Sequence, residues 1–204
     1  MSNISKGINT YVNAYYITMQ VNHSTESGGF ELRFVVHNKN YPDLSKLFHF
    51  DIINLLYMVN REDIIEQNHI TVLTPVEKIG DVGEACIQML FYHLFKDCGT
   101  PQYYLNMNMR LEIGDNMIQY SSSVQSDSPD FIAAIPARIR PPKPIPISKM
   151  DICVEFPGPC MASVVISFST DDEGRTVMAQ RSRMVTMIFK KMFTRLKEFI
   201  ETMT

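Results

Sequence analysis

The sequence predicts an α+β domain with a mainly antiparallel sheet, two central helices and a C-terminal amphipathic helix. Segments rich in aromatic and β-branched residues occur in pairs separated by short turn clusters, which is typical of antiparallel hairpins. Two stretches between these pairs carry apolar residues at helical spacing. A third such stretch, residues 180–204, ends the chain. Strand pairs interrupted by grouped helices indicate the α+β class.

Size and composition are those of a folded protein with a core of its own. The chain has 204 residues, of which 45% are apolar and 20% are charged. We predict a loose polar segment over residues 1–10 and a single α+β domain over residues 11–204. No signal sequence is visible, and no apolar run approaches about 18 residues, so a soluble or peripheral protein is expected. The 14 methionines suit adaptable packing surfaces and irregular cores.

The first strand pair is predicted at residues 10–22 and 30–38. The segments TYVNAYYITMQVN and FELRFVVHN are rich in aromatic and β-branched residues. The polar cluster HSTESGG between them is typical of a turn. The two segments therefore predict a hairpin with a long loop.

Two helices are predicted in the middle of the chain. The first begins at Asp43, whose side chain can cap a helix, and ends near Asn60. The second begins at Asp81 and ends near Cys98, where a Gly-Thr-Pro sequence stops it. Residues 69–76 form a short extended piece between the two helices.

Further strands are predicted on both sides of a proline-rich tract. Residues 103–113 alternate cleanly between apolar and polar side chains, and residues 117–124 form the return strand. Residues 126–149 hold six prolines, which predicts extended or irregular backbone. Two more strands follow at residues 150–156 and 161–169.

The last helix is predicted to begin near Gln180, after an acidic turn at residues 171–174. One half of this helix is apolar, while Arg183, Lys190 and Lys197 lie together on the opposite half. The apolar half can cover the sheet of the domain, dock on a partner or insert shallowly into a membrane. Its members are Met184, Val185, Ile188, Phe189, Met192, Phe193, Leu196, Phe199, Ile200 and Met203.

Charge is distributed unevenly along the chain. The last 25 residues carry six basic and two acidic side chains, a net charge of +4. Because the whole chain has a net charge of −3, the remainder carries −7. A second basic stretch, with Arg138, Arg140 and Lys143, lies in the proline-rich tract. That stretch either resembles a basic polyproline ligand or forms a rigid crossing between two strands. A positive patch on an acidic body predicts contact with anionic surfaces or partners.

No arrangement of residues predicts catalysis, a metal or a cofactor. Cys86 and His93 share a helical face, but Cys98 lies about 120° away on such a helix. The acidic residues 171–173 alternate in direction on an extended chain. Glycine-rich phosphate loops and a GxSxG elbow are missing. An enzyme without local motifs stays open as a third hypothesis, to be recognised by a deep pocket with convergent titratable groups.

Two local stretches resemble rhabdovirus matrix proteins. TYVNAYYITMQVN is similar to the aromatic strand that opens the folded core of that family, and ASVVISFSTDDEG is similar to a late strand and acidic turn. Unlike that family, residues 1–10 carry only one basic residue, Lys6, and no PPxY motif is present.

The resemblance implies a non-enzymatic viral structural protein that self-associates and bridges the nucleocapsid to the membrane. Its expected partners are further copies of itself, the viral nucleocapsid, an anionic membrane surface and host proteins, in the virion and the host cytoplasm. The six basic residues named above, Arg138, Arg140, Lys143, Arg183, Lys190 and Lys197, would make these contacts. The alternative is a cytosolic adaptor or regulatory interaction protein without a membrane role.

Overall fold

The structure, a computed structural model, describes most of the chain. The described residues are 17–23, 28–94, 96–125, 129–135, 141–170 and 172–204, and the side chains of 18–23, 28, 98 and 172–184 are not described. The expected loose segment 1–10 therefore lies outside the described residues, as do residues 10–16 of the first predicted strand.

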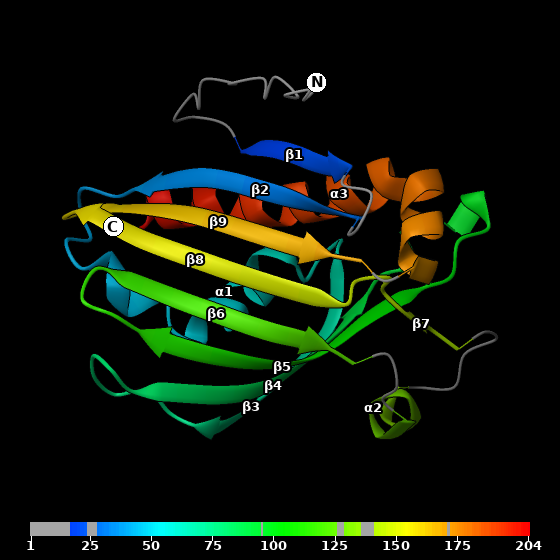
Figure 1. Cartoon of the computed structure of the whole chain (residues 1–204), viewed down its shortest axis with the longest axis horizontal. Helices are drawn as coiled ribbons and strands as arrows, with labels where there is room; N and C mark the ends of the chain where they lie inside the picture. Colours follow the sequence, from blue (N-terminus) through cyan, green and yellow to red (C-terminus); the bar gives the residue numbers. More distant parts are fainter. Residues whose placement is uncertain (1–16, 24–27, 95, 126–128, 136–140, 171) are drawn as a thin grey trace, which may run out of the picture.

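Nine strands form one sheet within the described residues (Figure 1). They are β1 (Thr18–His23), β2 (Gly28–His37), β3 (Ile65–Thr74), β4 (Val82–Phe91), β5 (Tyr103–Ile113), β6 (Met117–Val124), β7 (Lys143–Pro144), β8 (Lys149–Gly158) and β9 (Met161–Ser169). The order is β1-β2-β9-β8-β6-β5-β4-β3, and β7 pairs with β5. The described pairings are antiparallel except for the short one between β5 and β7. The predicted fold class, α+β with a mainly antiparallel sheet, is thus confirmed.

Two helices cover one face of this sheet and leave the other face toward the viewer in Figure 1. The described helices are η1 (Leu44–Leu47), α1 (Asp51–Asn60), η2 (Lys96–Cys98), α2 (Pro129–Ala134) and α3 (Asp172–Thr202). Helices α1 and α3 lie behind the sheet, and the main core forms between them and the inner face. Strand β9 is typical of the pattern: alternate side chains from Ala162 to Phe168 are buried, as expected for a strand covered on one face.

The apolar half of α3 packs on the sheet, so the first of the three predicted roles is confirmed. Val185, Phe189, Met192, Phe193, Leu196 and Ile200 are buried. The Phe189 ring lies 4.7 Å from the Phe168 ring and 5.9 Å from the Phe30 ring, measured between centroids. The helix begins at Asp172 and not near Gln180, so it already covers residues 172–174 of the segment predicted as a turn.

Polar side chains fix α3 against its neighbours. The Asn38 amide donates to the carbonyl oxygens of Ile200 at 2.6 Å and Met203 at 2.9 Å. These bonds satisfy carbonyls that the end of a helix leaves without partners. The Asn60 amide, at the end of α1, donates to Met192 O at 3.3 Å. Helix α1 and the residue that follows β2 therefore hold the C-terminal half of α3 in one position.

The second predicted helix, from Asp81 to Cys98, is wrong: most of this segment is strand β4. Ala85 and Met89, which suggested a helical face, are four residues apart, and that spacing also lies on one face of a strand. The residue between them, Ile87, is fully buried as well, which fits a period of two. Pairing with β3 on one side and β5 on the other decides the matter.

Three other predictions change in detail. The helix predicted from Asp43 is divided into η1 and α1, because the Asp43 carboxylate accepts from the Ser45 hydroxyl at 2.6 Å and caps no backbone N–H. The extended piece predicted at residues 69–76 belongs to the ten-residue β3. The tract predicted as irregular, residues 126–149, contains α2 and β7. The other predicted strands are confirmed.

Candidate functional site

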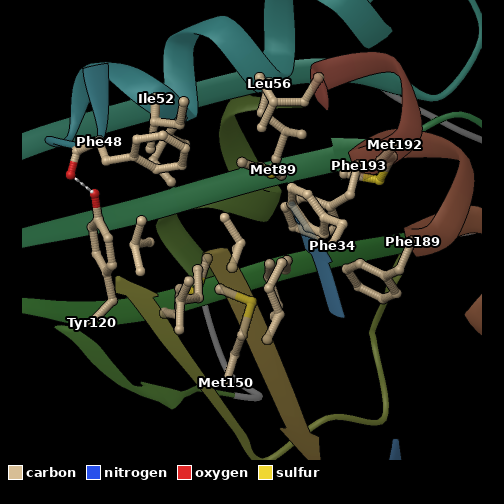
Figure 2. A pocket seen from close by; sticks show the side chains of 18 residues that line it. Phe34, Phe48, Ile52, Leu56, Met89, Tyr120, Met150, Phe189, Met192 and Phe193 are labelled. Carbon is tan, nitrogen blue, oxygen red and sulfur yellow. Dashed lines mark hydrogen bonds between the residues drawn. The ribbon is translucent and has the colours of Figure 1, made fainter. Parts of the chain in front are cut away.

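An apolar cavity of about 40 Å³ lies between the sheet and helices α1 and α3 (Figure 2). Eighteen residues line it, and they come from six strands of the sheet, from the end of the η1 turn, and from both helices. They are Phe34, Phe48, Ile52, Ile53, Leu56, Met89, Leu105, Met107, Tyr120, Met150, Ile152, Val154, Val164, Ile166, Phe189, Met192, Phe193 and Leu196.

Methionine side chains line this cavity from both the sheet and α3. Met89, Met107, Met150 and Met192 are among its lining residues and are at most 5% exposed. Strand alternation places the first three on the inner face, and Met192 comes from the apolar half of α3. Methionine has three rotatable bonds and fills irregular gaps, so these walls can change shape at low cost.

Tyr120 brings the one polar side-chain atom into the described lining. Its hydroxyl donates a hydrogen bond to the backbone carbonyl of Phe48, in the turn between η1 and α1 (Figure 2). The ring is 1% exposed, and burial, with a smaller contribution from the Asp51 carboxylate, raises the pKa of the Tyr120 phenol well above 10.0. The phenol is therefore neutral at physiological pH.

This lining can bind apolar groups and offers little else. Apart from Tyr120, the lining residues carry no titratable side chain. Among the described residues, no group of three or more His, Cys, Asp or Glu side chains is placed to hold a metal ion. General acid–base chemistry needs a titratable group within hydrogen-bond reach of the substrate.

The cavity is smaller than a usual ligand site. Ligand pockets measure about 300–1,000 Å³, whereas this cavity has room for little more than a water molecule. A second cavity of about 20 Å³ lies nearby against Val185 and Ile188 of α3. The contact between the rings of Phe91 and Phe189, with centroids 6.3 Å apart, lies between the two cavities because each ring lines one of them. Side chains must move before a ligand of ordinary size can enter.

One member of the cationic strip predicted on α3, Lys197, does not face outward. Lys197, expected to face outward, is 4% exposed, and its ammonium pairs with Glu201. It lies four residues after the buried Phe193, at the border of the apolar half, where its stem packs against the domain. Lys191 and Arg195 both pair with Asp63.

Of the remaining predicted site residues, the structure describes the side chains of Lys143 and Lys190. Lys190 is exposed and has no carboxylate partner among the described residues. Lys143 is exposed on β7. Arg138 and Arg140 lie outside the described residues, and so does the side chain of Arg183. No described helix is long and apolar enough to span a bilayer.

Comparison of sequences leaves the family open, since no family model and no curated protein matches. Two solved structures share the fold. Human STARD10 aligns with a TM-score of 0.58 and 10% identity over 92% of this chain and 71% of its own. The lipid transfer and protein localization domain of human StarD13 aligns with a TM-score of 0.56 and 8% identity, over 92% and 86%. The fold is START-like.

The START-like fold corrects the resemblance to rhabdovirus matrix proteins, which is wrong. The stretches that carried it, residues 10–22 and 162–174, include β1, β9 and the start of α3. Strand composition of this kind occurs in many sheets and does not specify their order. The predicted matrix function, a structural protein that bridges nucleocapsid and membrane, is wrong as well. The alternative, an interaction protein without a membrane role, agrees better with this fold.

The cavity itself was not predicted. The signal that bears on it is the excess of methionine, since four of the 14 methionines line the cavity. That signal indicates adaptable packing but gives no location, because the lining residues are spread from Phe34 to Leu196.

Proposed function

We propose that this protein is a non-enzymatic binding protein that takes a small apolar molecule between its sheet and α3. The observation that carries this proposal is the lining of the cavity: it is apolar except for the Tyr120 hydroxyl, which already has a partner in Phe48. An apolar molecule leaves water without leaving any polar group of the protein unsatisfied.

The energy balance allows binding even though the cavity is small. A ligand that buries about 250 Å² of apolar surface gains about 6 kcal/mol. Moving two or three lining side chains away from their preferred rotamers costs about 0.5–1.5 kcal/mol each. The remainder, about 1.5–5 kcal/mol, corresponds to dissociation constants from hundreds of micromolar to tens of millimolar. Met89, Met107 and Met150 are the side chains best suited to move.

Likeness to the StarD13 domain supports the class of ligand. That domain is described as one for lipid transfer and protein localization. A lipid or lipid-like molecule with a small apolar portion is therefore the class that we favour. The lack of acid, base or metal groups in the described lining supports binding over catalysis.

A neutral fluorescent probe tests this function. We expect the fluorescence of N-phenyl-1-naphthylamine to rise saturably with the wild-type protein and to be reversed by a neutral lipid competitor. Met192→Ala enlarges the cavity and should tighten binding of the probe, because fewer side chains must move. Met187→Ala is the matched control, since Met187 is on the same helix but 54% exposed. Absence of saturable binding to both the wild type and Met192→Ala contradicts the proposal.

A second candidate is an adaptor that uses only its surface. The near-complete filling of the interior, with about 40 Å³ left, favours this reading because a well-packed core needs no ligand. The same experiment separates the two: an adaptor with a packed core binds the probe only after Met192→Ala creates space, whereas a ligand-binding protein binds it as the wild type.

A further inference from the structure

A second hollow, of about 450 Å³, lies on the face of the sheet opposite to α1 and α3. The exposed side chains around it come from four neighbouring strands, β3 to β6. They are Leu73, Glu84, Asn108, Arg110, Ser121 and Ser123. Alternation explains their direction, because Ala85 and Met109, next to Glu84, Asn108 and Arg110 in the sequence, are buried on the inner face. This is the uncovered face that Figure 1 turns toward the reader.

Strand register and a bulge produce the hollow. Arg110 lies between Glu84 of β4 and Ser121 of β6, and Asn108 lies opposite Ser123. The small serine side chains leave the floor low beside the longer ones. Leu73 forms the rim: Val72 pairs with Ala85 and Thr74 with Glu84, so Leu73 is the extra residue of a bulge and is 65% exposed. Bulges often turn a side chain toward a binding site.

Three polar side chains of the hollow are free to bind a ligand. Among the described residues, the side chains of Asn108, Ser121 and Ser123 make no hydrogen bond within the protein. Arg110 donates from Nε to Glu112 at 3.0 Å. Outside the lining, opposite Ser121 on β8, Asp151 pairs through Oδ2 with Lys149 at 2.6 Å, while its buried Oδ1 has no partner. A donor that reaches this oxygen would satisfy it.

The charges select against ions. The two charged residues of the lining, Glu84 and Arg110, have opposite signs, so neither an anion nor a cation meets charges of one sign there. The hydroxyl groups of Ser121 and Ser123 and the amide of Asn108 each donate and accept hydrogen bonds. Groups with this dual capacity match the hydroxyl groups of a polyol, and Leu73 can contact its C–H surface.

We propose that this hollow binds a neutral polyhydroxylated molecule of the size of a monosaccharide or disaccharide. Its volume lies within the range of about 300–1,000 Å³ that is usual for small-molecule sites. The site is on the other face of the sheet from the apolar cavity, so this inference is independent of the proposed function.

Titration of the full chain, followed by ¹H–¹⁵N correlation spectra, tests the inference. Maltose, lactose and sucrose are added separately to about 50 mM, because an open site of this kind binds with millimolar dissociation constants. We expect at least one of them to shift the amide signals of Glu84, Asn108 and Ser121 saturably. Glucuronate and glucosamine, which carry opposite charges on similar rings, should bind more weakly.

Two substitutions locate the site. Asn108→Ala should weaken binding of the responding sugar about tenfold, since it removes hydrogen bonds made in the hollow. Ser163→Ala, on the same face of the sheet but on β9, should leave binding unchanged. The inference is overturned if none of the three sugars shifts these signals or if a charged sugar binds equally well. It is also overturned if the signals move with protein concentration alone, which would assign the hollow to contact between copies.

Discussion

The environment of Lys197 decides between two descriptions of the basic side of α3, a buried border of the helix and an exposed cationic surface. Charge reversal at Lys197 and at Lys190 tests which description is correct. The Lys197 ammonium is buried and pairs with Glu201, whose carboxylate also accepts the backbone N–H of His37 at 3.1 Å. Lys190, on the same helix, is exposed. Lys197→Glu places a second carboxylate beside Glu201 and buries it without a cation, whereas Lys190→Glu changes only a solvated side chain.

The expected costs differ by several fold. Removing one partner of a buried ion pair costs about 3–5 kcal/mol. The side chain of Glu201 is 27% exposed, so water screens part of this penalty, and we expect about 2–4 kcal/mol for Lys197→Glu. Lys190→Glu should stay within about 0.5 kcal/mol of the wild type, as surface substitutions usually do.

Urea unfolding at pH 7 measures both variants. Lys197→Met provides a matched control, because it keeps an apolar stem in the buried site and removes only the charge; we expect it to cost about 1 kcal/mol, less than Lys197→Glu. If Lys197→Glu unfolds at the same urea concentration as Lys190→Glu, the Lys197 side chain reaches water. The outward cationic strip predicted from the sequence would then be correct.

Three further predictions concern stability. Phe193→Ala removes a buried ring that contacts Phe34 at 6.2 Å between centroids and should lower the free energy of unfolding by about 3–5 kcal/mol, measured in urea. Burial raises the pKa of Tyr120 above 10.0, so its contribution is complete below that pH and is lost as the pH rises further; Tyr120→Phe should flatten the alkaline part of a stability–pH curve. The Arg195 guanidinium, helped by Lys191, lowers the pKa of Asp63 below 3.8, so stability is lost as the pH falls through that lowered value; Asp63→Asn should weaken this acid dependence in thermal melts.

The strands could be predicted where a single face is buried. Residues 103–113 and 161–169 alternate so regularly that the sequence alone indicates half-buried antiparallel strands, and the structure confirms both. Strand β4 was not predicted as a strand, because it is apolar on both faces near its end: Met89, Leu90 and Phe91 are all buried. Leu90 faces the outer side of the sheet, where it packs with Phe131 of α2. A run of this kind has no regular period that would distinguish a strand from a buried helix.

The sites could not be predicted, because both depend on register between distant segments. The helical wheel places Lys197 among the charges of α3, yet the residue lies only about 40° from Phe193 on that wheel, so the position of β2 decides whether it is buried. In the same way, Glu84, Arg110 and Ser121 are ordinary polar positions until the register of β4, β5 and β6 aligns them in one row. The apolar pattern of each segment determines which face it presents, whereas strand order determines which faces meet. The positions of the cavity and of the hollow therefore depend on strand order and register, which local sequence specifies least.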